Sequence, residues 1–106
     1  MGVFFSHHEE FGPKTADFRV NIRYCGSWGY YTYAAVAEDL LTNEFGDKLH
    51  IVSDKDRWVT GNLDLTITNN KTGETEVIHS KSRGDGFITK ANKNSIVSKI
   101  EQFMEK

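Results

Sequence analysis

The 106-residue sequence has a single cysteine, so one chain can form neither an internal disulfide nor a cysteine-based zinc site. It also lacks a hydrophobic run that approaches the roughly 18 consecutive apolar residues of a membrane span. No secretory hydrophobic segment is visible, because Val3, Phe4 and Phe5 are followed at once by polar residues. These absences favour a reducing, cytoplasmic setting and argue against stable membrane insertion.

An excess of charge of either sign is missing as well. The formal net charge is −2 and the pI is about 6.1. Such a balance provides no basic surface for DNA or RNA, so we expect no nucleic-acid partner. Apolar residues make up 38% of the chain and charged residues 26%, which is typical of a soluble globular domain.

Proline is almost absent, and the one proline lies in a first segment without hydrophobic periodicity. We therefore expect residues 1–17 to form a flexible N-terminal arm. Residues 18–106 have the length of one compact domain, and no internal linker divides them.

Two motifs in the arm invite a functional interpretation. Residues 7–10 (HHEE) could suggest a metal cluster, but metal sites need ligands held on rigid elements, so we expect no metal. Residues 1–6 fit the pattern for N-myristoylation of Gly2. A single acyl chain gives only marginal membrane binding, and no polybasic run follows as a second anchor.

Hydrophobic periodicity predicts four strands and two helices after the arm. Phe18–Tyr24 alternates with a period of two, and a helical pattern runs from Tyr30 to a glycine cap at Gly46. The remaining elements are predicted at Leu49–Val52, Leu63–Thr68, Thr75–His79 and Ile96–Met104, with a charged loop at Ser53–Arg57. A crossover helix predicts that the first two strands are parallel, and a short turn predicts an antiparallel hairpin for the last two. The order β-α-β-β-β-α predicts an α/β, thioredoxin-like two-layer sandwich with a mixed four-stranded sheet.

Cys25 follows the first predicted strand directly and begins the turn to the first helix. The N-terminal end of a helix carries partial positive charge, which lowers the pKa of a nearby thiol and makes the sulfur more nucleophilic at neutral pH. We therefore predict that Cys25 is a reactive thiol.

Other groups allow both a functional and a structural interpretation. The loop 80–86 could hold an anion such as a glutathione carboxylate, or it could be a solvated connection. An aromatic cluster near the turn could be a ligand platform, or it could pack the first helical turn against the sheet. The cluster comprises Trp28, Tyr30, Tyr31 and Tyr33. For His79 we favour a packed or hydrogen-bonded structural role over that of a catalytic base.

Three stretches in the same order resemble the selenoprotein W family, also called the Rdx group. They are YCGSWGY at 24–30, Thr60-Gly61 before the third predicted strand, and IHSKSRGDGF at 78–87. The resemblance covers Phe18 to the C-terminus. It implies a small thioredoxin-like oxidoreductase with a Cys-x-x-Sec or Cys-x-x-Cys site, a role in antioxidant defence or cell redox homeostasis, and glutathione as redox partner with no bound cofactor. Client proteins would bear thiols, and 14-3-3 proteins are among the implied partners.

Carried onto this sequence, the resemblance implies Cys25 and Trp28 as the two redox positions. It implies binding roles for Gly26, Ser27, Thr60, Gly61, Lys81, Gly84 and Asp85. Trp28 departs from the family pattern, since an indole cannot resolve a mixed disulfide.

Two explanations of Trp28 stay open. The codons for selenocysteine (UGA) and tryptophan (UGG) differ by one base, so the native residue could be selenocysteine. Alternatively the protein naturally lacks the second redox residue. It would then be a monothiol protein or a non-catalytic protein-interaction module.

Overall fold

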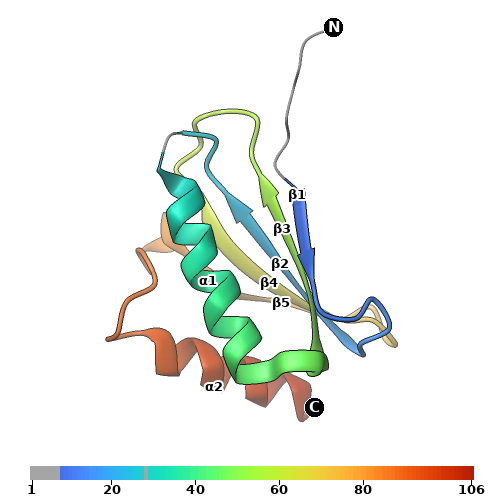
Figure 1. The fold of residues 1–106 in the computed structure, drawn as a ribbon. Helices are drawn as coiled ribbons and strands as arrows, with labels where there is room; N and C mark the ends of the chain where they lie inside the picture. Colours follow the sequence, from blue (N-terminus) through green and yellow to red (C-terminus); the bar gives the residue numbers. More distant parts are fainter. Residues whose placement is uncertain (1–7, 28) are drawn as a thin grey trace, which may run out of the picture.

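A five-stranded mixed sheet carries both α-helices of the described chain on one of its faces (Figure 1). The structure is a computed structural model that describes residues 8–27 and 29–106. The strand order is β1-β3-β2-β4-β5. The strands are β1 (His8–Phe11), β2 (Phe18–Tyr24), β3 (Leu49–Lys55), β4 (Leu63–Asn69) and β5 (Thr75–Ser80), and the helices are α1 (Tyr30–Phe45) and α2 (Lys93–Met104), with short 3-10 turns η1 (Gly46–Lys48) and η2 (Lys81–Arg83).

The central strand β2 forms as its alternating sequence predicts. Val20, Ile22 and Tyr24 are buried towards the helices, while the polar residues between them lie on the opposite face. β2 pairs in parallel with β3 and antiparallel with β4, and β4 pairs antiparallel with β5. These findings confirm the predicted α/β class, the parallel pair and the hairpin, and the arrangement is compatible with a thioredoxin-like fold.

The predicted count of four strands is wrong, because His8–Phe11 forms a fifth strand. β1 pairs antiparallel with β3, with His8 opposite Asp54 and Phe11 opposite Ile51. These four residues belong to the stretch that we expected to be a flexible arm. They form a short edge strand with one apolar side chain against the core, so the sequence shows no apolar alternation there. Residues 1–7, with the candidate acylation site Gly2, lie outside the described residues.

Strand β3 is longer than predicted and continues through part of the expected charged loop. It ends at Lys55 rather than at Val52. Because β1 and β2 pair with its two edges, backbone hydrogen bonds extend the strand into a polar stretch.

A bulge in β5 changes the predicted pattern of its side chains. We expected Thr75, Val77 and His79 to alternate along one face. The register shifts opposite Leu65 and Thr66, so that Val77 is 41% exposed while Ile78 and His79 are both buried. The His79 ring forms a 2.7 Å hydrogen bond between Nε2 and the carbonyl oxygen of Gly86, so this histidine has the structural role that we favoured.

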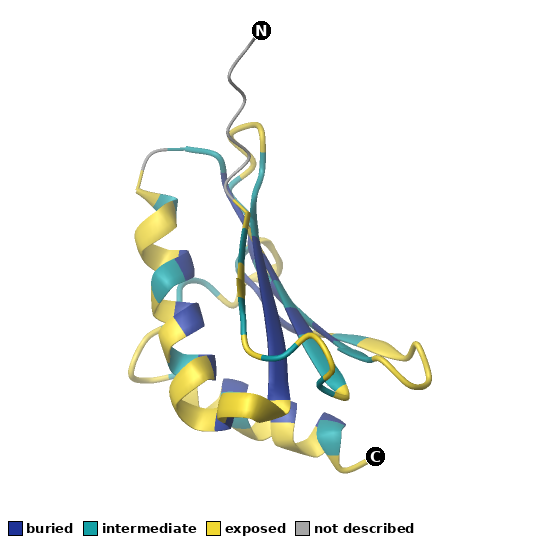
Figure 2. Ribbon diagram, turned by 45° about the vertical axis from the view of Figure 1, so that its right-hand side comes forward, coloured by how far each residue is buried: buried dark blue, intermediate teal, exposed yellow. Residues whose placement is uncertain are grey.

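The hydrophobic core lies between the sheet and the two helices (Figure 2). Each helix buries residues at helical spacing: Ala34, Ala37, Leu41 and Phe45 in α1, and Ile96, Ile100 and Phe103 in α2. Within residues 8–27 and 29–106, no helix combines the length and apolar character that a membrane crossing would require.

Candidate functional site

The turn that follows β2 is held against the loop that joins β3 to β4, here called the β3–β4 loop (residues 56–62). Both segments lie at the same end of the sheet (Figure 1). The Cys25 amide donates to the Asn62 carbonyl at 2.8 Å, and the Gly26 amide donates to the Trp58 carbonyl at 2.9 Å. Two consecutive amides of the turn are therefore bonded to the loop, which fixes the position of Cys25.

Gly26 is required for this close approach of two backbones. A Cβ atom at position 26 would lie 2.7 Å from the Trp58 carbonyl oxygen and would also collide with the Asp56 carbonyl oxygen. Both obstacles are main-chain atoms, which cannot rotate away as a flexible side chain can. The predicted binding residue Gly26 thus has a definite packing role.

The sulfur of Cys25 is surrounded by hydrogen-bond donors. It accepts hydrogen bonds from the Ser27 amide at 3.4 Å and the Thr60 amide at 3.3 Å, and it lies 3.2 Å from the Ser27 hydroxyl oxygen. Burial raises the pKa of the Cys25 thiol, but hydrogen bonds from Ser27, Gly61 and Thr60 outweigh burial and lower it to about 7. The lowered pKa has the predicted direction, and its causes are hydrogen bonds from the turn and the β3–β4 loop, while the helix begins only at Tyr30.

The thiol is also covered, since Cys25 is only 1% exposed. The second redox position implied by the resemblance, Trp28, lies outside the described residues. The site therefore combines an acidic thiol with restricted access to it.

Asp56, which the sequence did not single out, organises the β3–β4 loop. Its carboxylate accepts from Arg23 Nε at 2.5 Å, from the Thr60 hydroxyl at 2.5 Å and from Asn62 Nδ2 at 3.1 Å. Burial raises the pKa of the Asp56 carboxyl, but these three partners outweigh it and hold the pKa below its usual value. Arg23 is 33 residues away in the sequence, so no local motif signals this network.

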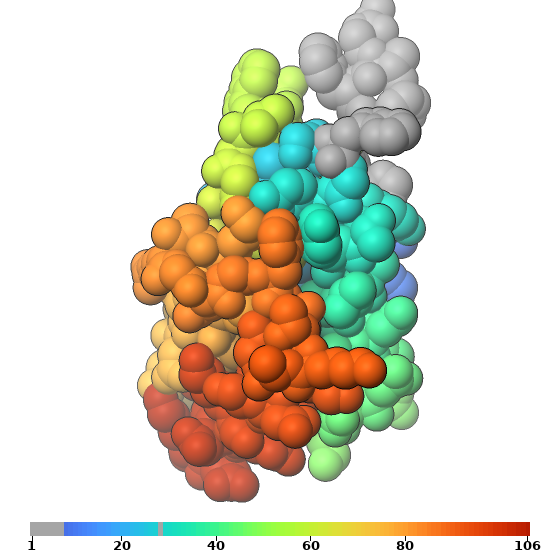
Figure 3. Space-filling model, turned by 90° about the vertical axis from the view of Figure 1, so that its left-hand side faces the viewer, coloured from blue at the N-terminus to red at the C-terminus, as the bar shows by residue number. Residues whose placement is uncertain are grey.

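Lys81 connects the loop after β5 to this site. Its ammonium donates to the Gly61 carbonyl at 3.4 Å and lies 5.8 Å from the ring centre of Tyr30 and 5.1 Å from that of Phe87. Figure 3 shows the loop after β5 (orange) packed against the N-terminal part of α1 (teal), with the β3–β4 loop (yellow-green) above. The structure thus joins Cys25, Gly26, Ser27, Thr60, Gly61 and Lys81 by direct contacts.

Gly84 and Asp85 have roles within their own loop. Gly84 ends the η2 turn with a φ of 103°, in the left-handed region that favours glycine. The Asp85 carboxylate accepts a 2.9 Å hydrogen bond from the Ser80 amide. These two predicted binding residues therefore shape the loop that carries Lys81.

The aromatic cluster divides into packed and exposed rings. Tyr33 stacks on Phe87 with ring centres 4.0 Å apart, and Tyr30 meets Tyr33 edge to face at 5.6 Å. Tyr31 is half exposed. Trp58 and Val59 on the β3–β4 loop are 76% and 79% exposed, and the sequence had not distinguished them as surface residues.

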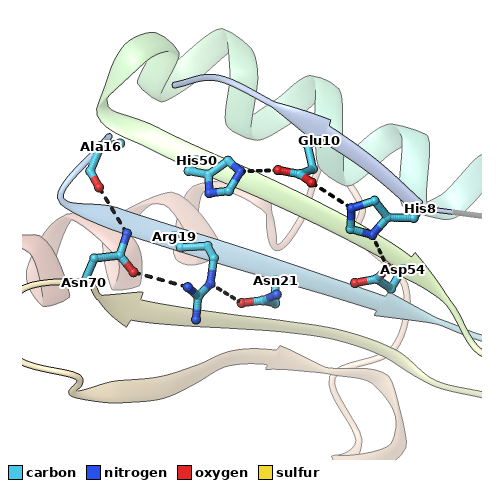
Figure 4. Close-up of polar contacts among 8 residues, drawn as sticks. All are labelled: His8, Glu10, Ala16, Arg19, Asn21, His50, Asp54 and Asn70. Atoms are coloured by element: carbon cyan, nitrogen blue, oxygen red, sulfur yellow. Dashed lines mark hydrogen bonds and ion pairs between the residues drawn. The ribbon is translucent and has the colours of Figure 1, made fainter. Parts of the chain in front are cut away.

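The uncovered face of the sheet carries a separate polar network (Figure 4). His8 hydrogen-bonds with Asp54 at 2.5 Å and with Glu10 at 2.8 Å, and Glu10 hydrogen-bonds with His50 at 2.7 Å. This chain of contacts fastens β1 to β3. Nowhere in the described ranges do three or more histidine, cysteine or acidic side chains gather in a way that could hold a metal ion.

The chain is similar to selenoprotein W of Danio rerio, with 33% identity over 89 residues that cover 83% of this chain and 96% of the relative. Mouse selenoprotein W is 31% identical over 74 residues, which cover 70% of this chain and 77% of the relative. Human selenoprotein V is 30% identical over 87 residues, but these cover only 23% of that longer protein. No model of a known protein family matches the chain.

Proposed function

This chain belongs to the selenoprotein W family, and from that premise we propose that it is a thioredoxin-like thiol redox protein whose reacting atom is the Cys25 sulfur. The observation that carries the proposal is the set of hydrogen bonds around this sulfur. Backbone amides from two separate loops donate to it, the Ser27 hydroxyl lies 3.2 Å away, and these hydrogen bonds lower the pKa of the thiol to about 7. A residue that only filled the core would need no such donors.

The proposed reaction is thiol–disulfide exchange. The Cys25 thiolate attacks one sulfur of oxidised glutathione or of a client disulfide, and a new sulfur–sulfur bond forms as the old one breaks. The leaving sulfur takes the bonding electron pair and departs as a thiolate, which then binds a proton. Cys25 is thereby oxidised to a mixed disulfide, and the departing sulfur is reduced.

A pKa of about 7 favours this reaction at neutral pH. At pH 7 about half of the thiol is ionised, against about 3% for an ordinary cysteine of pKa near 8.5. The lower pKa also reduces the intrinsic nucleophilicity by about fivefold. The roughly 16-fold gain in the thiolate fraction is therefore larger than the loss in nucleophilicity. Together the two effects raise the exchange rate about threefold, before the limited access to the buried sulfur is counted.

Position 28 decides how the cycle is completed. If selenocysteine stands there in the native protein, the selenol would attack and Cys25 would resolve the intermediate. With Trp28 as written, a second thiol from solution must release Cys25, because an indole forms no bond to sulfur. We propose that reduced glutathione or a client thiol fills this role, in the cytoplasm, with 14-3-3 proteins among the candidate clients.

Lys81 supports glutathione as the partner. Its 3.4 Å contact with the Gly61 carbonyl is long for a charged donor, and a carboxylate of glutathione could replace it. The aromatic faces of Tyr30 and Phe87 would hold the ammonium in place during the exchange.

Intact-mass measurement after incubation with oxidised glutathione at neutral pH tests the proposal. We expect one glutathionyl group on the folded chain and none on a Cys25→Ser variant. A folded chain that stays unmodified, while the same chain in denaturant is modified, would contradict it.

A second candidate is a protein-interaction module without redox turnover. The full cover over Cys25 and the exposed Trp58, Val59 and Tyr31 favour it. The same experiment separates the two functions, since a module of this kind needs no reaction at Cys25.

A further inference from the structure

The β3–β4 loop lies against the buried Cys25 thiol, to which its Thr60 amide donates, without any apolar anchor of its own. Four consecutive residues of this loop, Arg57 to Thr60, are exposed. The loop therefore gains little from burial of apolar surface. Its position must depend on polar contacts, and among the described side chains the Asp56 carboxylate makes three of them.

Thr60 connects this carboxylate to the sulfur. Its hydroxyl donates to Asp56 at 2.5 Å, and its backbone amide donates to Cys25 Sγ at 3.3 Å. Asn62 forms a second connection, because its side chain donates to Asp56 at 3.1 Å while its carbonyl accepts from the Cys25 amide at 2.8 Å. Both connections from the loop to Cys25 are thus held by one carboxylate.

Arg23 ties the same carboxylate to the sheet. It lies in the central strand β2, and its Nε donates to Asp56 at 2.5 Å. The Asp56 side chain is only 7% exposed. A carboxylate so enclosed is costly unless its hydrogen-bonding capacity is met, so the loop has one strongly preferred arrangement.

We propose that Asp56 is a positioning residue for Cys25, which holds the β3–β4 loop closed over the thiol and keeps the Thr60 and Gly61 amides directed at the sulfur. In the closed loop the sulfur is covered and its thiolate is stabilised. When the loop opens, reagents reach the sulfur and the thiol meets water. Regulation of redox exchange by this loop rests on the function proposed above. The access of reagents to Cys25 and the ionisation of its thiol can be measured without any redox partner.

The rate of alkylation of the full chain by iodoacetamide, measured across pH, tests the proposal. For Asp56→Ala we expect the rate at the alkaline plateau to rise several-fold, because the cover is lost. We also expect the midpoint of the pH–rate profile to rise by about one pH unit from about 7, towards the pKa of an ordinary exposed thiol near 8.5. The sign is diagnostic, since removal of a negative charge by itself would lower the midpoint of a neighbouring thiol.

Two further variants complete the design. Asp64→Asn is the control, because it also removes one negative charge from a residue paired with Arg23. Asp64 accepts a hydrogen bond from Ser80 and not from the β3–β4 loop, so the alkylation profile of this variant should match that of the wild type. Thr60→Val removes the hydroxyl partner of Asp56 and keeps the amide that faces the sulfur, and it should shift the profile in the same direction as Asp56→Ala.

A folded Asp56→Ala variant with a wild-type plateau and midpoint would overturn the proposal. If that variant does not fold, Thr60→Val decides, and a wild-type profile there would overturn it equally. Failure of the proposed redox function would give a different result. The variants would then shift the alkylation profile as predicted, but oxidised glutathione would leave Cys25 unmodified.

Discussion

Replacement of Gly26 by alanine tests the packing of the turn on the β3–β4 loop. The new Cβ atom would lie 2.7 Å from the Trp58 carbonyl oxygen, so the two backbones must separate. Separation weakens the 2.9 Å bond from the Gly26 amide to the same carbonyl. Overpacking costs about 1–3 kcal/mol and a lost hydrogen bond about 0.5–1.5 kcal/mol, so we expect a loss of about 1.5–4.5 kcal/mol in the free energy of unfolding.

Gly73→Ala is the matched control. It separates the effect of a Cβ atom that collides with neighbouring backbone from the effect of a positive φ that disfavours alanine. Gly73 has a φ of 80°, where alanine is strained by about 1–2 kcal/mol, but a Cβ there meets no atom within 4 Å. Gly26 does not have a positive φ. An argument from φ alone therefore ranks Gly73→Ala as the more harmful change, whereas the structure ranks Gly26→Ala as the more harmful one.

Urea unfolding followed by circular dichroism gives both free energies. We expect the midpoint of Gly26→Ala to lie clearly below that of Gly73→Ala, and its Cys25 thiol to be alkylated faster at high pH. A Gly26→Ala variant as stable as Gly73→Ala, with an unchanged thiol, would refute the argument that the loop and turn are in essential contact.

Three further predictions concern stability. Hydrogen bonds to Glu10 and Asp54 raise the pKa of His8 above its ordinary 6.5, so the stabilisation from His8 should be complete below that pH and decline as pH rises through the raised value. Hydrogen bonds from His8 and His50 lower the pKa of Glu10 to about 2, so its contribution should be present above pH 4.5 and decline as pH falls towards 2. Melting temperatures measured across pH should show both declines in stability. A His8→Gln variant should lose the decline at higher pH, and a variant with the same pH dependence as the wild type would contradict the role given to His8. Lys81→Met keeps the apolar stem and removes the ammonium over two aromatic rings, so it should cost about 0.5–1 kcal/mol in urea unfolding, and a neutral result would contradict the cation–π contribution.

The sequence predicts the elements whose stability comes from burial of one face. β2 alternates because one face meets the helices, and α1 and α2 show helical spacing for the same reason. β1 has no such signal, because its backbone pairing and its polar side-chain contacts are made with β3, which lies about 40 residues further along the chain. The bulge in β5 is also invisible, since it depends on the register between two strands.

The site divides in a similar way. Cys25 can be placed from its position after a strand, and the family resemblance adds Gly26, Ser27, Thr60, Gly61 and Lys81. Asp56 cannot be found in this manner, because its partners come from β2 and from its own loop only after the chain has folded. The cover over the thiol is likewise a tertiary feature, which no local pattern encodes.

The rate at which Cys25 forms a mixed disulfide with oxidised glutathione, measured as a function of pH, tests the central claim most directly. We predict a single glutathionyl adduct whose rate rises with a midpoint near pH 7, matching the thiol held by Ser27, Thr60 and Gly61. Absence of the adduct on the folded chain, or a midpoint at the ordinary thiol value of about 8.5, would contradict the claim that this sulfur is built for redox exchange.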